Sequence, residues 1–397
     1  MVSPDSELNA ALIQRRGDNL YRQRKILQSP QRARVLVDGC VCLGFSSNDY
    51  LALANHPALV EAFKQAADDY GVGSGASHLV SGHNAVHQAL EEDLAAFTDR
   101  PRALVFSTGY MANVGVIRAL TDRGDSVVQD RLNHASLLDG GFLSRAEFLR
   151  YPHGDLSTAG QLLGEVRSGR KLLATDGVFS MDGDLANLPA MAELAEAHGA
   201  WLMVDDAHGF GVLGERGRGI AEHYAMDLDN LPILVGTLGK SFGTFGAFVA
   251  GSEALIESLI QLGRTYIYTT ALPPAVAAAS REALKLIDSE SWRREKLHKL
   301  IAYFRRGAAQ LDIPLLDSIT PIQPVIIGDD SRTVAVGGHL FEAGFWVGVI
   351  RPPTVPRGGA RLRVTLSADH SEQDVDQLLE ALAAALKAIP LASGSGD

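Results

Sequence analysis

Cysteine is nearly absent from this chain, which has only Cys40 and Cys42 among its 397 residues. A disulfide between cysteines at this spacing would be badly strained, so we expect both thiols to be reduced, as in a cytoplasmic protein. Apolar runs are short, and none approaches the roughly twenty residues that span a bilayer. The amino terminus lacks the basic start and apolar stretch of a secretory signal. The sequence therefore favours a cytoplasmic location.

Long blocks of one charge are also missing, although the formal net charge is −11. This pattern disfavours general nucleic-acid binding, but a local basic patch could still receive an anionic substrate. With 46% hydrophobic and 21% charged residues, the composition is that of a globular protein. The length exceeds that of a single hydrophobic core and predicts two or three domains.

Hydrophobic patterning predicts four segments. Residues 1–45 form an N-terminal helix, Glu7–Leu27, and a hairpin that turns at Asp38-Gly39. Residues 46–286 form a large domain and residues 287–389 a small C-terminal domain, followed by a disordered tail at 390–397.

The large segment alternates short apolar strands with helical stretches, which is typical of an α/β domain. Its strands are continuously hydrophobic, so we expect a mostly parallel sheet that is flanked by helices on both faces. The predicted strands are 103–106, 126–129, 171–175, 201–204, 233–235 and 247–250, with a tight return at 243–247. The small segment follows two long helices and mixes strands at 322–327, 345–350 and 361–366 with helices at 331–343 and 371–388, as in an α+β domain.

Two residues that follow predicted strands carry the strongest chemical signal. Asp205 ends the strand 201–204, and Lys240 lies among small residues just beyond the strand 233–235. Ligands of open α/β sheets bind at the carboxyl ends of the strands. An amine that can form a Schiff base and a carboxylate that can hold a pyridinium nitrogen are what pyridoxal phosphate (PLP) requires of a protein.

Other loops after strands supply the remaining cofactor contacts. Gly109 and Tyr110 open a helical pattern, where unpaired backbone N–H groups favour a phosphate, and Thr237 can add a hydroxyl group. His134 can stack on a pyridine ring or transfer a proton, although a helix-capping histidine is an alternative. His208 lies three residues after Asp205, and Ser180 lies in the run 176–183 that follows another predicted strand. Both residues could reach the phenolic oxygen of the cofactor.

Two further patterns carry less weight. The glycine-rich run 71–76 follows a helical stretch rather than a strand, which argues against a dinucleotide site. His83 and His87 have the i, i+4 spacing of a metal pair, with Glu91 on the same face. No glutamate occupies the helical position that a metalloprotease needs, so we expect no metal.

Five short sequence motifs resemble those of the α-oxoamine synthases, which are PLP-dependent enzymes of fold type I. These motifs are Ser46–Leu51, Asn133–Leu137, Gly177–Gly183, Asp205–Gly209 and Thr237–Lys240. The resemblance extends from about Asn9 to Ala385. It implies an acyltransferase that joins an amino acid to an acyl thioester with loss of CO₂. One departure is the run Gly75–Leu79, where many relatives carry a second glycine and an arginine.

Within this family, the run Ile350–Pro356 most resembles enzymes that condense L-alanine with a pimeloyl thioester, carried on coenzyme A or acyl carrier protein, in biotin biosynthesis. The resemblance also implies a homodimer and no nucleic-acid or membrane partner. It implies that Lys240, His134, Asp205 and His208 are catalytic. It assigns the cofactor to Gly109, Tyr110, His134, Ser180, Asp205, His208, Thr237, Lys240 and Thr270, and the substrates to Arg22, Asn48, His134, Arg351, Thr354 and Arg363.

Three alternative functions remain open at this point. The first is a sister enzyme that uses glycine or serine with another acyl thioester. The second is a PLP aminotransferase, which shares the aspartate and the lysine. His134 argues against it, because aminotransferases usually place another aromatic residue at this position. The third is a PLP-binding sensor or scaffold without catalytic activity.

Overall fold

The structure is a computed structural model that describes residues 3–18 and 20–390. Its contacts divide the chain into two units, each of which is described by itself below. The larger unit contains residues 49–180 and 184–296, and the smaller unit contains residues 1–48, 181–183 and 297–397. The smaller unit thus combines the predicted N-terminal segment with most of the predicted C-terminal domain. Of the predicted tail, 390–397, residues 391–397 lie outside the described residues.

A seven-stranded sheet forms the centre of the larger unit, in the order β3-β9-β8-β7-β6-β4-β5. Strand β9 is antiparallel to both of its neighbours, and the other strands pair in parallel. The predicted mostly parallel sheet is therefore confirmed. Its strands are β3 (Arg102–Phe106), β4 (Ser126–Asp130), β5 (Glu147–Tyr151), β6 (Lys171–Asp176), β7 (Ala200–Asp205), β8 (Ile233–Thr237) and β9 (Ala247–Gly251).

Burial explains which strands the sequence pattern predicts. The residues of β4, β8 and β9 are buried along their whole length. Strand β5 was absent from the predicted strands, because Glu147 and Arg150 are exposed and interrupt its apolar pattern. Among the described strands it pairs only with β4, at the end of the sheet, so one of its sides can carry polar residues.

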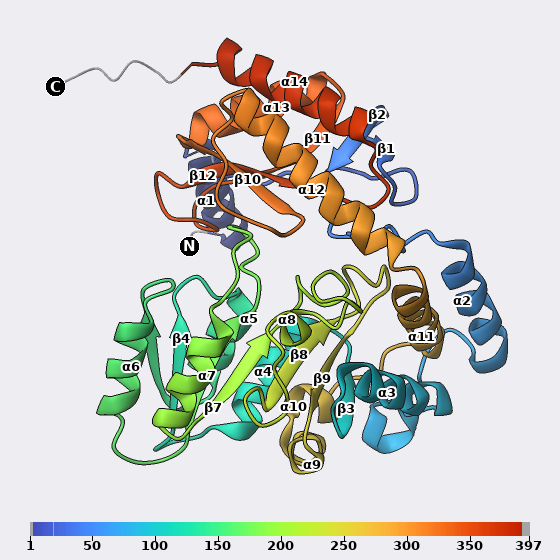
Figure 1. Cartoon of the computed structure of the whole chain (residues 1–397), viewed down its shortest axis with the longest axis vertical. Helices are drawn as coiled ribbons and strands as arrows, with labels where there is room; N and C mark the ends of the chain where they lie inside the picture. Colours follow the sequence, from blue (N-terminus) through green and yellow to red (C-terminus); the bar gives the residue numbers. More distant parts are fainter. Residues whose placement is uncertain (1–2, 19, 391–397) are drawn as a thin grey trace. The chain divides into compact units, whose positions relative to one another are not determined.

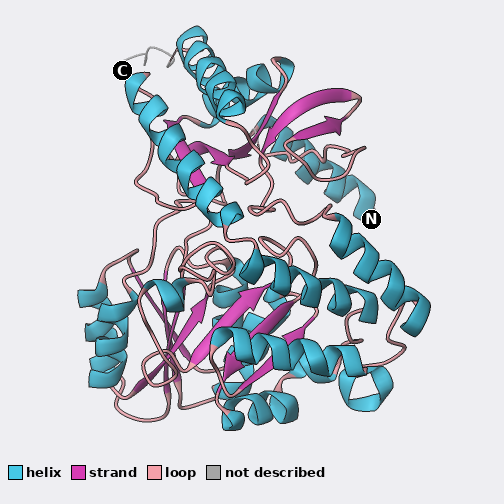
Figure 2. Ribbon diagram, turned by 45° about the vertical axis from the view of Figure 1, so that its right-hand side comes forward, coloured by secondary structure: helices cyan, strands magenta, loops and turns pink. Residues whose placement is uncertain are grey.

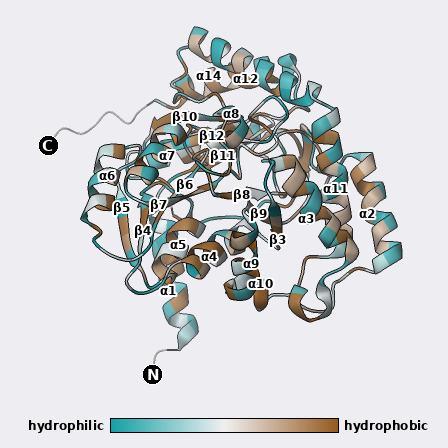
Figure 3. Cartoon of the chain, turned by 60° about the horizontal axis from the view of Figure 1, so that its bottom comes forward, coloured by the Kyte–Doolittle hydropathy of each residue, from teal (hydrophilic) through white to brown (hydrophobic). Residues whose placement is uncertain are grey.

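Helices cover both sides of this sheet. Right-handed crossovers require α4 and α5 on one side and α6 and α7 on the other, because the chain reverses its direction across the sheet after β5. Figure 3 shows α4 and α5 on the side opposite to α7. The helical segments of the larger unit are α2 (Pro57–Tyr70), η1 (His78–Gly82), α3 (Ala85–Thr98), α4 (Gly109–Leu120), α5 (Ala135–Leu143), α6 (Leu156–Glu165), α7 (Leu188–Ala197), α8 (Ile220–His223), α9 (Glu253–Leu262), α10 (Arg264–Ile267) and α11 (Pro274–Ser289).

A five-stranded sheet forms the centre of the smaller unit, in the order β1-β2-β11-β12-β10. Strands β2 and β11 pair in parallel, and the other pairs are antiparallel. Figures 1 and 2 show its strands and helices. The elements are α1 (Pro4–Gly17), β1 (Arg34–Val37), β2 (Cys40–Phe45), α12 (Trp292–Gln310, whose first turn belongs to the larger unit), β10 (Ile322–Gly328), α13 (Asp330–Glu342), β11 (Phe345–Ile350), β12 (Ala360–Thr365) and α14 (Glu372–Ala388).

The N-terminal segment corrects one prediction and confirms another. Helix α1 ends at Gly17, so the predicted helix Glu7–Leu27 is too long. Leu27 instead forms an isolated antiparallel bridge with Val37. The predicted hairpin is confirmed, because β1 and β2 pair across a turn in which Asp38 and Gly39 have φ angles of 49° and 79°. Both cysteines are free, as expected. Among the described residues, no helix has the length and apolar character of a membrane span.

Candidate active site

The carboxyl ends of β6, β7 and β8 meet at one edge of the larger sheet, because these strands are parallel neighbours. A cavity of about 180 Å³ lies there. Eight of the predicted cofactor residues line it: Gly109, Tyr110, His134, Ser180, Asp205, His208, Thr237 and Lys240. Three residues that the sequence did not single out line it as well, namely Ser136, Asp176 and Ala207.

Asp205 is buried at the end of β7, with only 6% of its surface exposed. Its Oδ1 accepts a hydrogen bond of 2.9 Å from the backbone N–H of Ala207. Its Oδ2 accepts one of 2.6 Å from the side-chain amide of Asn113, on α4. Hydrogen bonds to both oxygens fix the orientation of the carboxylate in the cavity wall. Asn113 is therefore a positioning residue that the sequence interpretation missed.

Lys240 lies on the loop between β8 and β9, in a chain of polar groups. Its Nζ is 2.7 Å from Nε2 of His208, and Nδ1 of the same ring is 2.7 Å from the hydroxyl of Tyr50. Tyr50 is fully buried and His208 is 7% exposed, so both rings are held by packing. This arrangement directs the amine and the imidazole into the cavity that they share with Asp205.

His134 caps a helix and also lines the cavity, while its predicted stacking on the cofactor ring stays a prediction. Its Nδ1 accepts a hydrogen bond of 3.3 Å from the backbone N–H of Ser136, so the residue caps α5, and the same nitrogen lies 2.7 Å from the Ser136 hydroxyl. The ring also lines the cavity. Burial lowers the pKa of His134 below its ordinary value, while the charge of Asp205 acts in the opposite direction. The imidazole is therefore mainly neutral at pH 7.

The first turn of α4 supplies the donors expected for an anion. Thr108 caps the helix by accepting a hydrogen bond of 3.1 Å from Met111 N. The N–H groups of Gly109 and Tyr110 belong to the first turn, where a helix offers no intrahelical acceptor. The Thr237 hydroxyl donates to Gly246 O at 3.0 Å and accepts from Gly239 N at 3.2 Å. Its oxygen therefore also orders the loop that carries Lys240.

Asp176 ends β6 and is paired in register with Asp205 of β7. Its Oδ2 accepts a hydrogen bond of 2.6 Å from the backbone N–H of His134. Burial, followed by the charge of Asp205, raises the pKa of Asp176 well above its ordinary value. Asp176 therefore links the His134 loop to the sheet, and its carboxyl group resists ionisation.

His153 forms a bridge between two loops near the cavity. Its Nδ1 lies 3.1 Å from Asp130 Oδ2, and its Nε2 lies 3.0 Å from Asp184 Oδ2. The two carboxylates raise the pKa of His153 to about 10, so the ring is a cation at neutral pH. Asp130 precedes the His134 loop and Asp184 follows the Ser180 loop. The bridge therefore connects the segments that carry two residues of the site.

Thr270 lies elsewhere in the larger unit. It is exposed, and it is not among the described residues that line the cavity. It forms an isolated bridge with Ser77, and its carbonyl accepts a hydrogen bond of 3.4 Å from the Ser107 hydroxyl. Its predicted contact with the phosphate of a neighbouring subunit stays a prediction.

The five remaining predicted substrate residues belong to the smaller unit. Arg363 Nη1 donates a hydrogen bond of 3.1 Å to Asn48 Oδ1, so the two residues predicted to bind the amino acid carboxylate are adjacent. Arg22 Nη2 donates to Thr354 Oγ1 at 3.2 Å. Arg22, Arg351 and Thr354 line one cavity of about 790 Å³.

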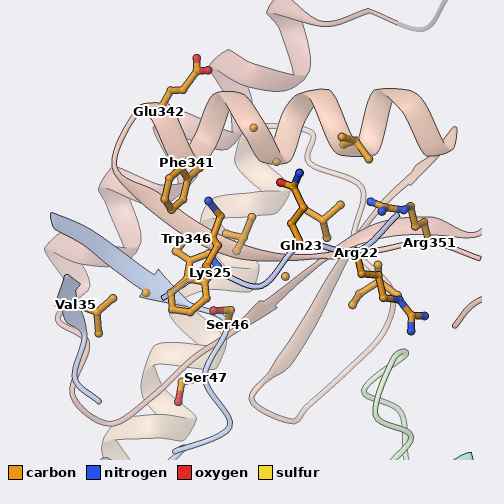
Figure 4. Close-up of a pocket in the computed structure, with 18 of the residues that line it drawn as sticks. Arg22, Gln23, Lys25, Val35, Ser46, Ser47, Phe341, Glu342, Trp346 and Arg351 are labelled. Atoms are coloured by element: carbon orange, nitrogen blue, oxygen red, sulfur yellow. The ribbon is translucent and has the colours of Figure 1, made fainter. Parts of the chain in front are cut away.

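Figure 4 shows how the side chains of this cavity are distributed. Arg22 and Arg351 lie at one end, and the rings of Phe341 and Trp346 lie toward the other. Lys25 Nζ is 3.3 Å from the centre of the Phe341 ring, a cation–π contact that holds the amine against the apolar end. The cavity thus combines a basic region with an apolar wall.

The glycine-rich run 71–76 follows a helix rather than a strand, as expected from the sequence. Helix α2 ends at Tyr70, and Gly71 caps its carboxyl terminus with a φ angle of 76°. A dinucleotide fingerprint instead follows a strand and opens a helix.

Similar proteins place this arrangement in a family. The model of the family described as Aminotransferase class I and II matches residues 41–382. The 8-amino-7-oxononanoate synthase of Saccharophagus degradans is 58% identical over 390 residues, which cover 98% of each chain. That of Pseudomonas fluorescens is 60% identical over 377 residues, which cover 95% of this chain and 96% of the relative. The chain belongs to the 8-amino-7-oxononanoate synthase family. The resemblance to the α-oxoamine synthases is thereby confirmed.

Solved structures agree with this assignment. Serine palmitoyltransferase from S. paucimobilis, with a bound PLP–myriocin aldimine, aligns with a TM-score of 0.93 and 28% identity over 98% of this chain and 99% of its own. The 8-amino-7-oxononanoate synthase of Francisella tularensis aligns with a TM-score of 0.77 and 34% identity over 87% of this chain and 98% of its own. The predicted fold, PLP-dependent fold type I, is therefore confirmed.

Proposed function

We propose that this chain condenses L-alanine with a pimeloyl thioester to give 8-amino-7-oxononanoate, CO₂ and the free thiol carrier, as a step of biotin biosynthesis. The observation that carries the proposal is that Asp205 and Lys240 line one cavity. The identity of 58–60% to synthases of this name supports the choice of substrates.

The residues of the cavity fit PLP as the cofactor. A buried carboxylate, a primary amine and the first turn of a helix match its ring nitrogen, its aldehyde and its phosphate. Asp205 would pair with the ring nitrogen, Lys240 with the aldehyde, and Gly109, Tyr110 and Thr237 with the phosphate. His134 would stack on the ring, and Ser180 and His208 would contact the phenolic oxygen. When bound, PLP supplies an electron sink for the bonds that break at the alanine Cα.

Lys240 is the proposed base. Once its amine is free, Nζ removes the proton from the alanine Cα, and it can later return a proton to the same carbon. His208 lies 2.7 Å from Nζ and orients the amine during both transfers. Asp205 would favour a protonated ring nitrogen by placing a negative charge beside it, and Asn113 holds the carboxylate in position.

The bond changes of the reaction balance without an oxidant or a reductant. A bond forms between the alanine Cα and the pimeloyl carbonyl carbon, the C–S bond breaks, and the thiol leaves with a proton. The bond from Cα to the carboxylate then breaks, CO₂ leaves, and Cα takes up a proton. Arg363 and Asn48 would hold the carboxylate of alanine until this second step.

The larger cavity of the smaller unit is proposed for the acyl substrate. Arg22, Arg351 and Thr354 provide donors for anionic or polar groups of a pimeloyl thioester, and Trp346 and Phe341 provide an apolar wall. Either coenzyme A or acyl carrier protein could carry the acyl group, and purified enzyme supplied with each carrier would show which is used.

A substrate panel tests the proposal. The purified protein with PLP should release thiol from pimeloyl-CoA in the presence of L-alanine, with a product of the mass of 8-amino-7-oxononanoate. Glycine with acetyl- or succinyl-CoA and serine with palmitoyl-CoA represent the sister enzymes. Preference for one of those pairs, or keto acid formation without thiol release, would contradict the proposal. Binding of PLP with no turnover on any pair would instead support a sensor or scaffold.

The proposal includes a homodimer in the cytoplasm, in which Thr270 reaches the cofactor phosphate of the neighbouring subunit. Light scattering of the purified protein tests the subunit number. Mixed dimers of Thr270→Ala and Lys240→Ala chains test the crossing contact. They should contain one fully unaltered site if the contact crosses between subunits.

A further inference from the structure

Three histidines meet outside the site described above. His78 begins η1, His83 follows this turn, and His87 lies in the first turn of α3. One ring nitrogen of each lies within 4.8 Å of the others. The sequence analysis considered only the pair His83 and His87 and expected no metal there. It did not include His78, because the π-helical turn that brings this residue in has no spacing signature.

The hydrogen bonds of His87 fix its tautomer. Its Nδ1 accepts from the backbone N–H of Asn84 at 3.0 Å, so this nitrogen carries a lone pair. Its Nε2 lies 2.8 Å from the carbonyl oxygen of Leu272 and must donate its proton there. The donation of a ring N–H to a backbone carbonyl is the outer contact typical of a metal-ligating histidine, whereas Nδ1 is occupied by the Asn84 N–H, which a metal ion would have to displace.

His83 has a similar arrangement. Its Nε2 lies 3.3 Å from Gln88 Oε1, which can accept its proton. Its Nδ1 then carries a lone pair and lies 2.8 Å from Nδ1 of His78. One proton, on His78, must therefore lie between these two nitrogens. If His78 carried its proton on Nε2 instead, the Nδ1 lone pairs of both rings would be directed at a metal ion bound between them.

Two of the three rings are buried, since His78 is 9% exposed and His87 is fully buried, and burial disfavours a charged imidazole. The ring of His78 is held by stacking on Tyr266, with ring centres 4.9 Å apart. Neutral imidazole is the form that binds transition metals.

Nearby carboxylates do not complete the cluster. Glu91, on the same helix, points its Oε1 to the backbone N–H of Val105 at 2.9 Å, which gives it a structural role. The ligand set that the described residues offer is therefore three imidazole nitrogens. Such a set suits zinc and its neighbours in the first transition row better than magnesium or calcium, which prefer oxygen.

We propose that His78, His83 and His87 bind one divalent transition-metal ion of the zinc type. Metal–nitrogen bonds of about 2.0–2.1 Å separate tetrahedral ligands by more than 2.8 Å, so the His78–His83 contact must open slightly. His83 is exposed and can move. His87 would exchange its bond to Asn84 for the metal, and a water molecule can take the fourth position.

Such an ion would link three parts of the larger unit, namely η1, α3 and the segment 270–272. Leu272 O accepts hydrogen bonds from both His87 and Ser74, and Ala76 O accepts one of 3.0 Å from Ala271 N. The cluster therefore adjoins the segment 270–272, which includes Thr270. The metal would stabilise the junction of this segment with η1 and α3. This inference does not depend on the proposed reaction.

Zinc and cobalt binding to the tag-free holoenzyme test the site. We expect one Zn²⁺ per chain by equilibrium dialysis, and Co²⁺ should give the visible absorption of a four-coordinate nitrogen site. His83→Gln changes an exposed ligand and should weaken Zn²⁺ binding by about tenfold or more, since even indirect contacts of a metal site are worth about 10–100-fold in affinity. His339→Gln, an exposed histidine on α13, is the matched control and should bind Zn²⁺ normally.

Two readouts separate the possible outcomes. Zn²⁺ should raise the melting temperature of the unaltered protein and of His339→Gln, but not that of His83→Gln. The absorbance of the bound cofactor should stay unchanged, which excludes the cofactor as the metal ligand. Absence of Zn²⁺ binding by the unaltered protein, or equal binding by His83→Gln, would overturn the proposal and leave a hydrogen-bonded histidine cluster.

Discussion

Nζ of Lys240 lies 2.7 Å from Nε2 of His208, and the opposite nitrogen of this ring lies 2.7 Å from the hydroxyl of Tyr50. A buried phenol therefore orients the imidazole that in turn orients the proposed base. This relay connects three sequence motifs that lie far apart along the chain, namely Ser46–Leu51, Asp205–Gly209 and Thr237–Lys240.

Tyr50→Phe tests the relay. The variant keeps the buried ring and removes only the hydroxyl, so we expect normal folding and a lower kcat. The loss should be smaller than the about 10²–10⁴-fold contribution of a general base, because Lys240 is retained. Steady-state kinetics with alanine and pimeloyl-CoA measure it. Unchanged kcat would mean that the Tyr50 hydroxyl does not orient His208.

Asp205→Asn should reduce turnover far more than stability, because the amide has nearly the same shape but no negative charge. Asn113→Ala should have a milder effect of the same kind. A hydrogen bond to a charged group is worth about 1.5–3 kcal/mol, so this variant should bind PLP about tenfold to a hundredfold more weakly. Dialysis followed by cofactor absorbance measures the affinity. Equal PLP affinity in Asn113→Ala and unaltered protein would contradict the positioning role.

His153 should make stability depend on pH in the alkaline range. Its pKa is raised from 6.5 to about 10 by Asp130 and Asp184, so the folded state binds the proton more tightly than the unfolded state. The stabilisation is therefore complete below about pH 6.5 and is lost as the pH rises through about 10. His153→Gln should melt at a lower temperature than the unaltered protein at pH 7, and this difference should shrink above pH 10. A difference that is constant with pH would refute the charged bridge, and His339→Gln provides the control.

Arg363 and Asn48 should act together on the amino acid. Arg363 Nη1 donates to Asn48 Oδ1, so Asn48→Ala removes the group that orients the guanidinium. We expect a higher KM for alanine and little change in the KM for pimeloyl-CoA. Arg363→Lys keeps the charge but loses the planar pair of donors, and it should raise the same KM further. Equal changes in both KM values would argue against a role specific to the amino acid.

The sequence predicts those site residues that follow a recognisable local pattern, such as a short apolar strand. Asp205 and Lys240 follow short apolar strands, and the carboxyl ends of parallel strands meet at one edge, so their common cavity follows from the sheet. Asn113 was missed because it lies inside a helix that otherwise looks apolar. A polar residue four positions after Gly109, on a buried helix face, was the available signal.

The other features that the sequence did not predict have a common cause. They depend on tertiary contacts, which leave no pattern in the sequence. Strand β5 carries exposed charged residues that interrupt its apolar pattern. Helix α1 ends at Gly17, although the amphipathic sequence pattern continues beyond this residue. His153 meets Asp130 and Asp184 from positions 23 and 31 residues away. His78 joins His83 and His87 only through a π-helical turn.

Borohydride reduction of the holoenzyme tests the central claim most directly. The claim is that Lys240 carries the cofactor aldehyde in the cavity that it shares with Asp205. Reduction followed by peptide mass analysis should place one phosphopyridoxyl group on Lys240. Lys240→Ala should give no such label and no turnover while remaining folded. A label on another lysine, or normal turnover of Lys240→Ala, would contradict the account.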